Sequence, residues 1–223
     1  MSRDIRGEMK DYNLAKDKAA NNFETIVFPK IKDYFGFNCE YVSIESLKDD
    51  DTLSSKIRRM FSRLDNVCGV DGLVIDPRKG IKTIANRVQP MGRNFKPFNT
   101  FTVRTKRSTG TKTEYDKRLE AIREGYLYPM LTTQAYICEI NESEYKLLSC
   151  GVCNTQDLYN YIESTKDIKT RQNQYDNNHF IPVDWGEFGK NYDIYIYKEN
   201  DVTQSQTVYK KSTLTSWQAG YNV

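Results

Sequence analysis

An aspartate inside an apolar, strand-like segment is the first residue of this sequence that points to chemistry. Asp71 lies in GVDGLVID, residues 69–76, with Leu73 and Ile75 at the same parity. Successive side chains of a strand alternate between its two faces. A carboxylate on an apolar face is costly unless a partner or a cation compensates it. Asp71 is therefore a candidate metal ligand, with a carboxylate bonded to nearby backbone as the structural alternative.

Three further polar residues are placed where they could act together with Asp71. Arg87 and Gln89 share one face of the next predicted strand, residues 81–89, whereas Val88 points the other way. Glu24 lies on the first predicted helix, at the edge of the apolar face that should pack on the sheet. The chain thus presents a helix glutamate, a strand aspartate, a hairpin and a strand carrying Arg-Val-Gln, in that order.

This arrangement resembles the PD-(D/E)XK nuclease superfamily, which includes Holliday-junction resolvases and many restriction enzymes. The resemblance covers roughly residues 20–140 and implies a restriction-endonuclease-like fold in which Glu24 and Asp71 bind Mg²⁺ and Gln89 completes the catalytic set. Arg87 stands where the superfamily carries an acidic residue, and Gln89 where it usually carries lysine. Glu114 or Asp116 is the nearest carboxylate that could have taken over the missing acidic position. The stretches FTVRTKRSTGTKTEYDKR and TTQAYI also resemble phage-encoded proteins.

The mechanism that the resemblance implies is metal-assisted hydrolysis of a nucleic-acid phosphodiester. Mg²⁺ would neutralise the scissile phosphate and lower the pKa of the attacking water. Basic side chains in the second strand of the hairpin and downstream of it would hold the phosphate backbone or stabilise charge in the transition state. The residues expected in this role are Arg87, Arg104, Lys106, Arg107 and Lys117.

The charge distribution supports a polyanionic partner. The chain has 223 residues and a net charge of only +3. Residues 78–118 contain twelve basic and two acidic side chains, which gives this segment +10 and leaves −7 for the remainder. A basic segment in an otherwise acidic protein is typical of binding to nucleic acid or nucleotide phosphate.

The elements that must position these residues form one mixed α/β (α+β) domain. We expect a central mixed β-sheet flanked by helices over residues 1–163, followed by a linker and C-terminal extension over residues 164–223. Pro29 should interrupt the first helix. A capping box of Thr111 and Glu114 should begin the helix after the third strand. The expected elements are helices 14–35, 52–64, 111–124 and 154–162 and strands 40–46, 69–76, 81–89, 98–106, 132–140, 145–153, 181–184 and 193–198.

Several function classes are disfavoured by what the sequence contains. His179 is the single histidine, so histidine-dependent triads and histidine-rich metal sites would all depend on it. Cys150 and Cys153 form a lone C-x-x-C without a second pair, which favours buried thiols over zinc. No apolar run approaches the ~18 residues of a membrane helix, and no signal segment is visible, so a cytoplasmic location is expected.

Two other functions are compatible with the same residues. The degenerate Arg87-Val88-Gln89 motif favours a catalytically inactive, nuclease-fold viral protein that binds nucleic acid, a nucleotide signal or a host protein. A pure protein-interaction module is the third possibility. A homodimer is a possible assembly, because many enzymes of the resembled superfamily act as dimers.

Overall fold

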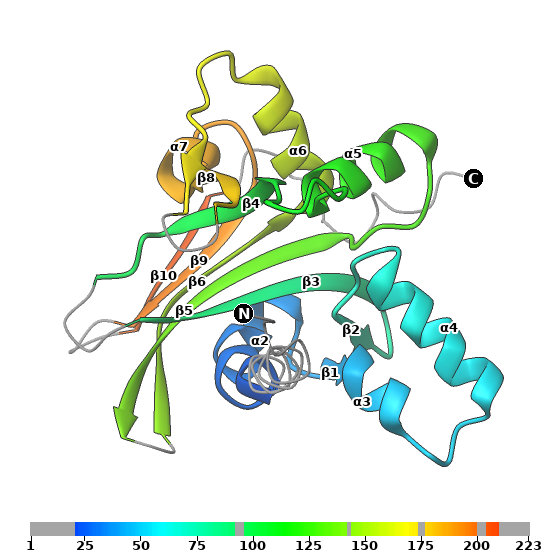
Figure 1. Cartoon of the computed structure of the whole chain (residues 1–223). Coiled ribbons are helices and arrows are strands. Elements are labelled where there is room, and N and C mark those ends of the chain that lie inside the picture. Colours follow the sequence, from blue (N-terminus) through cyan, green and yellow to red (C-terminus); the bar gives the residue numbers. More distant parts are fainter. Residues whose placement is uncertain (1–20, 92–95, 142–143, 174–176, 200–203, 210–223) are drawn as a thin grey trace, which may run out of the picture.

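The structure is a computed structural model, and it describes residues 21–91, 96–141, 144–173, 177–199 and 204–209. The described chain forms two β-sheets with helices on both sides of the larger one (Figure 1). Each face of the large sheet covers its own buried apolar cluster.

The large sheet has seven strands and is mixed. Its strand order is β1-β2-β3-β5-β6-β9-β10, and β3 and β5 are the one parallel pair among these described strands. Because a parallel pair needs a long crossover, the chain between β3 and β5 leaves the sheet and returns. The strands are β1 (Glu40–Ser43), β2 (Gly72–Asp76), β3 (Gly80–Met91), β5 (Leu131–Asn141), β6 (Glu144–Asn154), β9 (Ile194–Glu199) and β10 (Gln204–Tyr209).

The first face of the sheet is covered by the N-terminal helical segment, η1 (Phe23–Val27) and α2 (Phe28–Phe35). Phe23, Val27 and Ile31 are fully buried against the sheet. Pro29 has no N–H group and therefore cannot continue the α-helical hydrogen-bond ladder. A single π-helical turn directly precedes it, where the N–H of Phe28 donates to the carbonyl of Phe23. The helical run nevertheless continues to Phe35, so the effect at Pro29 is a change in the hydrogen-bond pattern and not the break that the sequence suggested.

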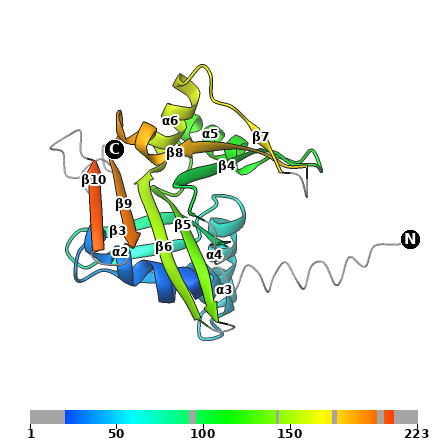
Figure 2. The same cartoon turned by 90° about the vertical axis from the view of Figure 1, so that its left-hand side faces the viewer.

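The second face is covered by a three-stranded sheet and three helices. This layer consists of β4 (Thr100–Lys106), β7 (Arg171–Gln172), β8 (His179–Asp184), α5 (Glu114–Glu124), α6 (Thr155–Ser164) and α7 (Trp185–Gly189). Figure 2 shows it stacked above the large sheet, with η1 and α2 below. Trp185, Phe188 and Phe101 are almost completely buried in its core.

Two further helices, α3 (Ile44–Asp49) and α4 (Ser55–Asn66), pack on each other beside β1 and β2. Ser54 caps α4 by accepting a hydrogen bond from the N–H of Ile57. The chain leaving α4 turns at Gly69, whose φ of +69° favours glycine, and enters β2. This turn brings the end of α4 next to Asp71.

The predicted mixed α/β fold with a central mixed sheet and flanking helices is confirmed, and several details differ. Residues 44–46, expected in a strand, begin helix α3. The strand expected over residues 98–106 pairs with β8 in the small sheet, because alternation fixes the face of a strand but not its partner. The capping box uses Thr113 and Asp116, not Thr111 and Glu114. The boundary expected at residue 164 does not separate two bodies among the described residues, since β8 pairs with β4 and β9 with β6. Residues 14–20 of the first predicted helix lie outside the described residues.

Candidate nucleic-acid interface

A cavity of about 890 Å³ lies between the large sheet and the layer that carries β4 and α5. Strands β3 and β5 and the residue directly before β2, Asp71, contribute its floor. Strand β4 and helix α5 form one wall, and α3, the end of α4 and the turn after it form the other. The crossover between β3 and β5 therefore supplies side chains directly above the parallel pair that it connects.

The strand register determines which residues lie side by side on the floor of this cavity. The N–H of Asp71 donates to the carbonyl of Ile84 at 2.9 Å, and Gly72 is paired with Ile84. Asp71 therefore lies opposite Ala85, which in turn is paired with Thr132 on β5. All three line the cavity, and the small side chain of Ala85 leaves room between the two polar ones. The next pair along β3 on this face is Arg87 and Gln134.

The carboxyl group of Asp71 is desolvated and accepts a hydrogen bond from the backbone of β3. Its Oδ2 accepts the backbone N–H of Asn86 at 2.8 Å, so the side chain takes the place of a strand carbonyl. Burial is the largest of the causes that raise the pKa of Asp71 to about 7; nearby Glu114 and Asp65 act in the same direction, and the Asn86 N–H and Arg118 act against it. The residue keeps some exposure to the cavity, yet desolvation outweighs the partners that favour its charged form.

Arg118 and Glu114 of α5 form an ion pair above Asp71. The two residues are one helical turn apart, and the Arg118 guanidinium also donates to the carbonyl of Gly69 at 3.4 Å. Arg118 is only 5% exposed, so it is a structural cation that ties α5 to the turn leading into β2. At the outer edge of the cavity, Lys48 is held by Glu45 at 2.6 Å and by Asp65 at 2.8 Å.

Other cations of the cavity are not neutralised in this way. Arg104, Arg107 and Lys117 make no ion pair with any other described residue. The Nε atom of Arg107 is buried without a hydrogen-bond partner, and Lys117 donates only to the carbonyl of Asn66 at 3.4 Å. Arg87 is oriented by a 3.2 Å hydrogen bond to the carbonyl of Thr102.

A second cavity of about 880 Å³ adjoins the first along β3 and β4. Arg87, Thr102 and Arg104 line both, so these side chains stand at the junction. Beyond the junction, the second cavity is lined by Gln89 of β3 and by the rings of Phe98 and Phe180. Together the two cavities form one groove, which we call the β3–β4 groove.

Gln134 is the least expected member of the site. Its side chain lines the first cavity beside Arg87, is only 2% exposed, and its amide nitrogen has no hydrogen-bond partner. A buried donor without a partner costs about 1–3 kcal/mol. On the other side of Gln134, the paired residue of β6 is Gly151, over which the ring of Trp185 packs.

The structure brings some of the predicted site residues together and separates others. Asp71, Arg87, Arg104, Arg107 and Lys117 all line the first cavity. Gln89 lines only the second, four residues beyond the partner of Asp71, which corresponds to roughly 13 Å along the strand. Lys106 is exposed and lines neither of the two.

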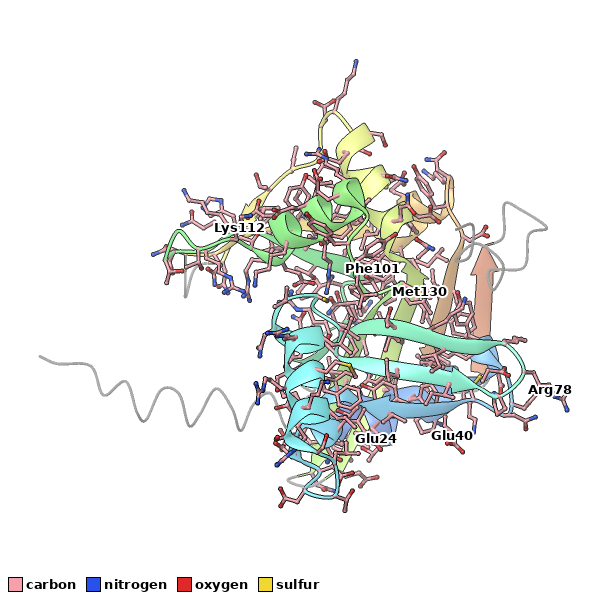
Figure 3. The ribbon with its side chains drawn as sticks, turned by 90° about the vertical axis from the view of Figure 1, so that its right-hand side faces the viewer. Glu24, Glu40, Arg78, Phe101, Lys112 and Met130 are labelled. Carbon is pink, nitrogen blue, oxygen red and sulfur yellow. The ribbon has the colours of Figure 1, made fainter. Side chains whose placement is uncertain are left out.

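Glu24 does not join the site. It is an exposed residue of η1, on the face of the sheet opposite the groove, and Figure 3 shows Glu24 and Phe101 on opposite sides of the ribbon formed by β1–β3. Tyr41 lies between, because its ring packs over Gly72 and its hydroxyl accepts a hydrogen bond from the Asn86 amide at 2.9 Å. Burial raises the pKa of Tyr41, and Asp71 and Glu24 add to the effect from either side.

The expected Mg²⁺ pair of Glu24 and Asp71 is therefore not assembled. Among the described residues, no three acidic, histidine or cysteine side chains come together in a way that could hold a metal ion. Asp71 instead shares its cavity with Glu114, one of the two carboxylates, with Asp116, that the sequence suggested for the missing acidic position; Asp116 does not line this cavity. Since Glu114 is bound to Arg118, these residues do not fit the metal site implied by the resemblance.

The remaining reactive side chains lie elsewhere. Cys150 and Cys153 are both buried, but Cys150 belongs to the apolar cluster under η1 and α2 and Cys153 to the cluster on the other face. Residues three apart on a strand point to opposite faces, so these thiols cannot share one ligand. His179 lines the second cavity at the start of β8.

Comparisons with known proteins add no relative to this description. No family model, no curated protein and no solved structure matches the chain. None of the helices among the described residues is long and apolar enough to cross a membrane.

Proposed function

We propose that this protein binds nucleic acid in the β3–β4 groove. The observation that carries the proposal is the set of cations that line the first cavity, Arg104, Arg107 and Lys117, which have no acidic partner among the described residues. Arg104 and Arg107 are half-buried and Lys117 is exposed, and cations that the protein leaves uncompensated are suited to an anionic ligand. Phosphate oxygens are favourable partners for guanidinium groups, since the planar donors bind them in pairs.

The groove also offers contacts for bases. Phe98 is 59% exposed at the second cavity, and Phe180 lines the same cavity. Aromatic rings beside a cationic track are typical of proteins that bind single-stranded nucleic acid, because bases stack on the rings while phosphates contact the cations.

The cysteines are compatible with the cytoplasmic location that we propose for this protein. All five are free thiols, and free thiols are typical of proteins in the reducing cytoplasm.

The test is the salt dependence of binding. We expect the double variant Arg104→Ala/Lys117→Ala to bind oligonucleotides more weakly and to reduce the slope of log K against log salt concentration by about 2, because each phosphate contact contributes about one to that slope. Fluorescence anisotropy with labelled single- and double-stranded DNA and RNA measures both quantities.

The matched control also removes two positive charges. Lys112 and Arg123 are bound to Glu120 and Glu163 and line neither cavity. The variant Lys112→Ala/Arg123→Ala should leave the slope nearly unchanged. Equal losses in the two double variants would show that overall charge, not the groove, attracts the nucleic acid and would contradict the proposal.

A second candidate function is hydrolysis of the bound phosphodiester. The observation that favours it is the presence of Asp71, with a pKa of about 7, and Glu114 in the same cavity as the unpaired cations. A carboxyl group that titrates near neutral pH in a cleft is suited to general acid–base catalysis.

The nuclease assay compares wild type with Asp71→Asn, which keeps an acceptor for the Asn86 N–H. Single- and double-stranded DNA and RNA are incubated with Mg²⁺, Mn²⁺ or EDTA, and products are resolved by gel. Cleavage by wild type that is lost in Asp71→Asn supports the enzyme. Binding without cleavage under every condition would agree with the binding function and contradict the proposed hydrolysis.

A further inference from the structure

The first cavity contains a buried hydrogen-bond donor that the fold itself leaves unused, the amide nitrogen of Gln134. We infer that this cavity receives one unpaired nucleobase of the bound nucleic acid, with Gln134 donating to an acceptor on the edge of the base. The inference deepens the proposed function and rests on it. It names the part of the ligand that enters the first cavity, whereas the proposed function concerns the backbone.

The position of Gln134 favours a ligand with a polar edge. It lies beside Arg87 on the floor of the cavity, one row from the small residue Ala85. The rest of the lining is mostly polar and charged and includes Asp71, Glu114 and Lys117. A cavity of about 890 Å³ falls within the size range of sites for small organic ligands.

The unpaired cations place the phosphate of the same nucleotide. Arg104 stands at the junction of the two cavities, and Arg107 lines the first one. With the base in the first cavity, its phosphate lies at the junction, and the neighbouring nucleotide extends into the second cavity toward Phe98. Gln134 then recognises a base, while the arginines contact only the backbone.

A base in a duplex cannot reach this position. Its edge is occupied by the partner strand and its faces by the stack, so it must be single-stranded or extruded before it enters a pocket. The inference therefore predicts a preference for unpaired nucleotides that comes from the first cavity itself.

The experiment compares ligands with and without bases. Fluorescence anisotropy is measured for the full chain with (dA)₆, (dC)₆ and (dT)₆, and with a hexamer of abasic deoxyribose phosphate. We expect wild type to bind at least one base-containing hexamer about tenfold more tightly than the abasic one, and Gln134→Met to lose most of that preference with unchanged affinity for the abasic hexamer. Gln134→Glu, which replaces the donor by an acceptor, should lose it as well.

The control is Gln156→Met, since Gln156 is an exposed residue of α6 that lines neither cavity. Competition with free nucleoside monophosphates distinguishes a base in a strand from a free nucleotide, and a mismatched duplex against a fully paired one tests extrusion. Circular dichroism confirms that each variant is folded.

Two results would overturn the inference and leave the proposed function intact. One is a Gln134 variant that keeps the full preference for bases, and the other is a variant that loses affinity for both kinds of hexamer equally. In either case, salt-dependent binding that still requires Arg104 and Lys117 would preserve the backbone contact. If the wild-type protein bound no oligonucleotide at all, both the inference and the proposed function would be contradicted.

Discussion

Asp71 couples the protonation of the cavity to the stability of the whole protein. Its pKa rises from 3.8 to about 7 on folding, because burial disfavours the charged form. Below about pH 4 both states are protonated. Between pH 4 and 7 the unfolded chain releases the proton that the folded chain retains, so the free energy of unfolding falls as pH rises through this window.

We therefore predict that Asp71→Asn is more stable than wild type at pH 8. The expected gain is on the order of 2–3 kcal/mol, since water in the cavity screens part of the charge, and it should vanish near pH 4. Urea denaturation at the two pH values measures the difference. Asp167→Asn, at an exposed position, serves as control. A variant that is less stable than wild type at pH 8 would show that the Asp71 carboxylate is well compensated in the fold.

At the level of single residues, the sequence predicted those whose type conflicts with their surroundings. Asp71 was identified because a carboxylate interrupts an apolar strand, and Arg87 because it shares a parity with Gln89. Gln134 carries the same signal in TTQAYI, where it has the parity of the buried Tyr136. Glu24 does not join the others because helical periodicity shows which side of a helix is apolar, but not which face of the sheet that helix covers.

The close approach of β6 to α7 is the most demanding contact between elements near the site. A Cβ atom on Gly151 would lie 2.5 Å from Cε2 of Trp185, whose ring is buried and cannot move aside. We predict that Gly151→Ala destabilises the protein by about 2–3 kcal/mol, as overpacked core substitutions do.

Ser149→Ala is the matched control for this prediction. Ser149 lies on the same strand, is equally buried, and its hydroxyl has no hydrogen-bond partner, so removal of the oxygen should cost little. Thermal denaturation of both variants measures the loss of stability that each substitution causes. A small effect of Gly151→Ala would mean that α7 shifts easily relative to β6.

At the level of elements, local sequence signals predicted where helices and strands form better than they predicted which strands pair. The hairpin of β2 and β3, the helix α5 and the long pair β5 and β6 were all expected from alternation, turn residues and caps. The pairing of β4 with β8 joins residues about eighty positions apart, and nothing in either segment alone specifies it. The wall of the candidate site depends on that pairing, so the cavity could not be derived from the sequence.

At the level of the whole molecule, strands from the C-terminal part of the chain complete both sheets. Strand β9 lies between β6 and β10, and β8 holds β4 in the small sheet. We predict that a chain ending at residue 163 does not fold cooperatively, because it lacks α7, β8 and β9 and exposes both apolar clusters. The expectation of an independent domain over residues 1–163 predicts the opposite.

Far-UV circular dichroism and urea denaturation of the truncated chain test this prediction. A chain ending at residue 199 retains the strands that contact both apolar clusters and removes β10, so it should unfold in one transition at a lower urea concentration than the full chain. A cooperative transition in the chain ending at residue 163 would show that the N-terminal part forms a self-sufficient core.

The crossover between β3 and β5 also has a consequence for the order of events during folding. The hairpin β2–β3 and the pair β5–β6 are local and can form early, whereas the parallel contact must wait for the closure of a long intervening loop. Asp71 and Arg87 belong to the first unit and Gln134 to the second. We therefore expect the cavity to form late in assembly, because its lining comes from both units, so that an incompletely folded chain has no assembled site for a ligand.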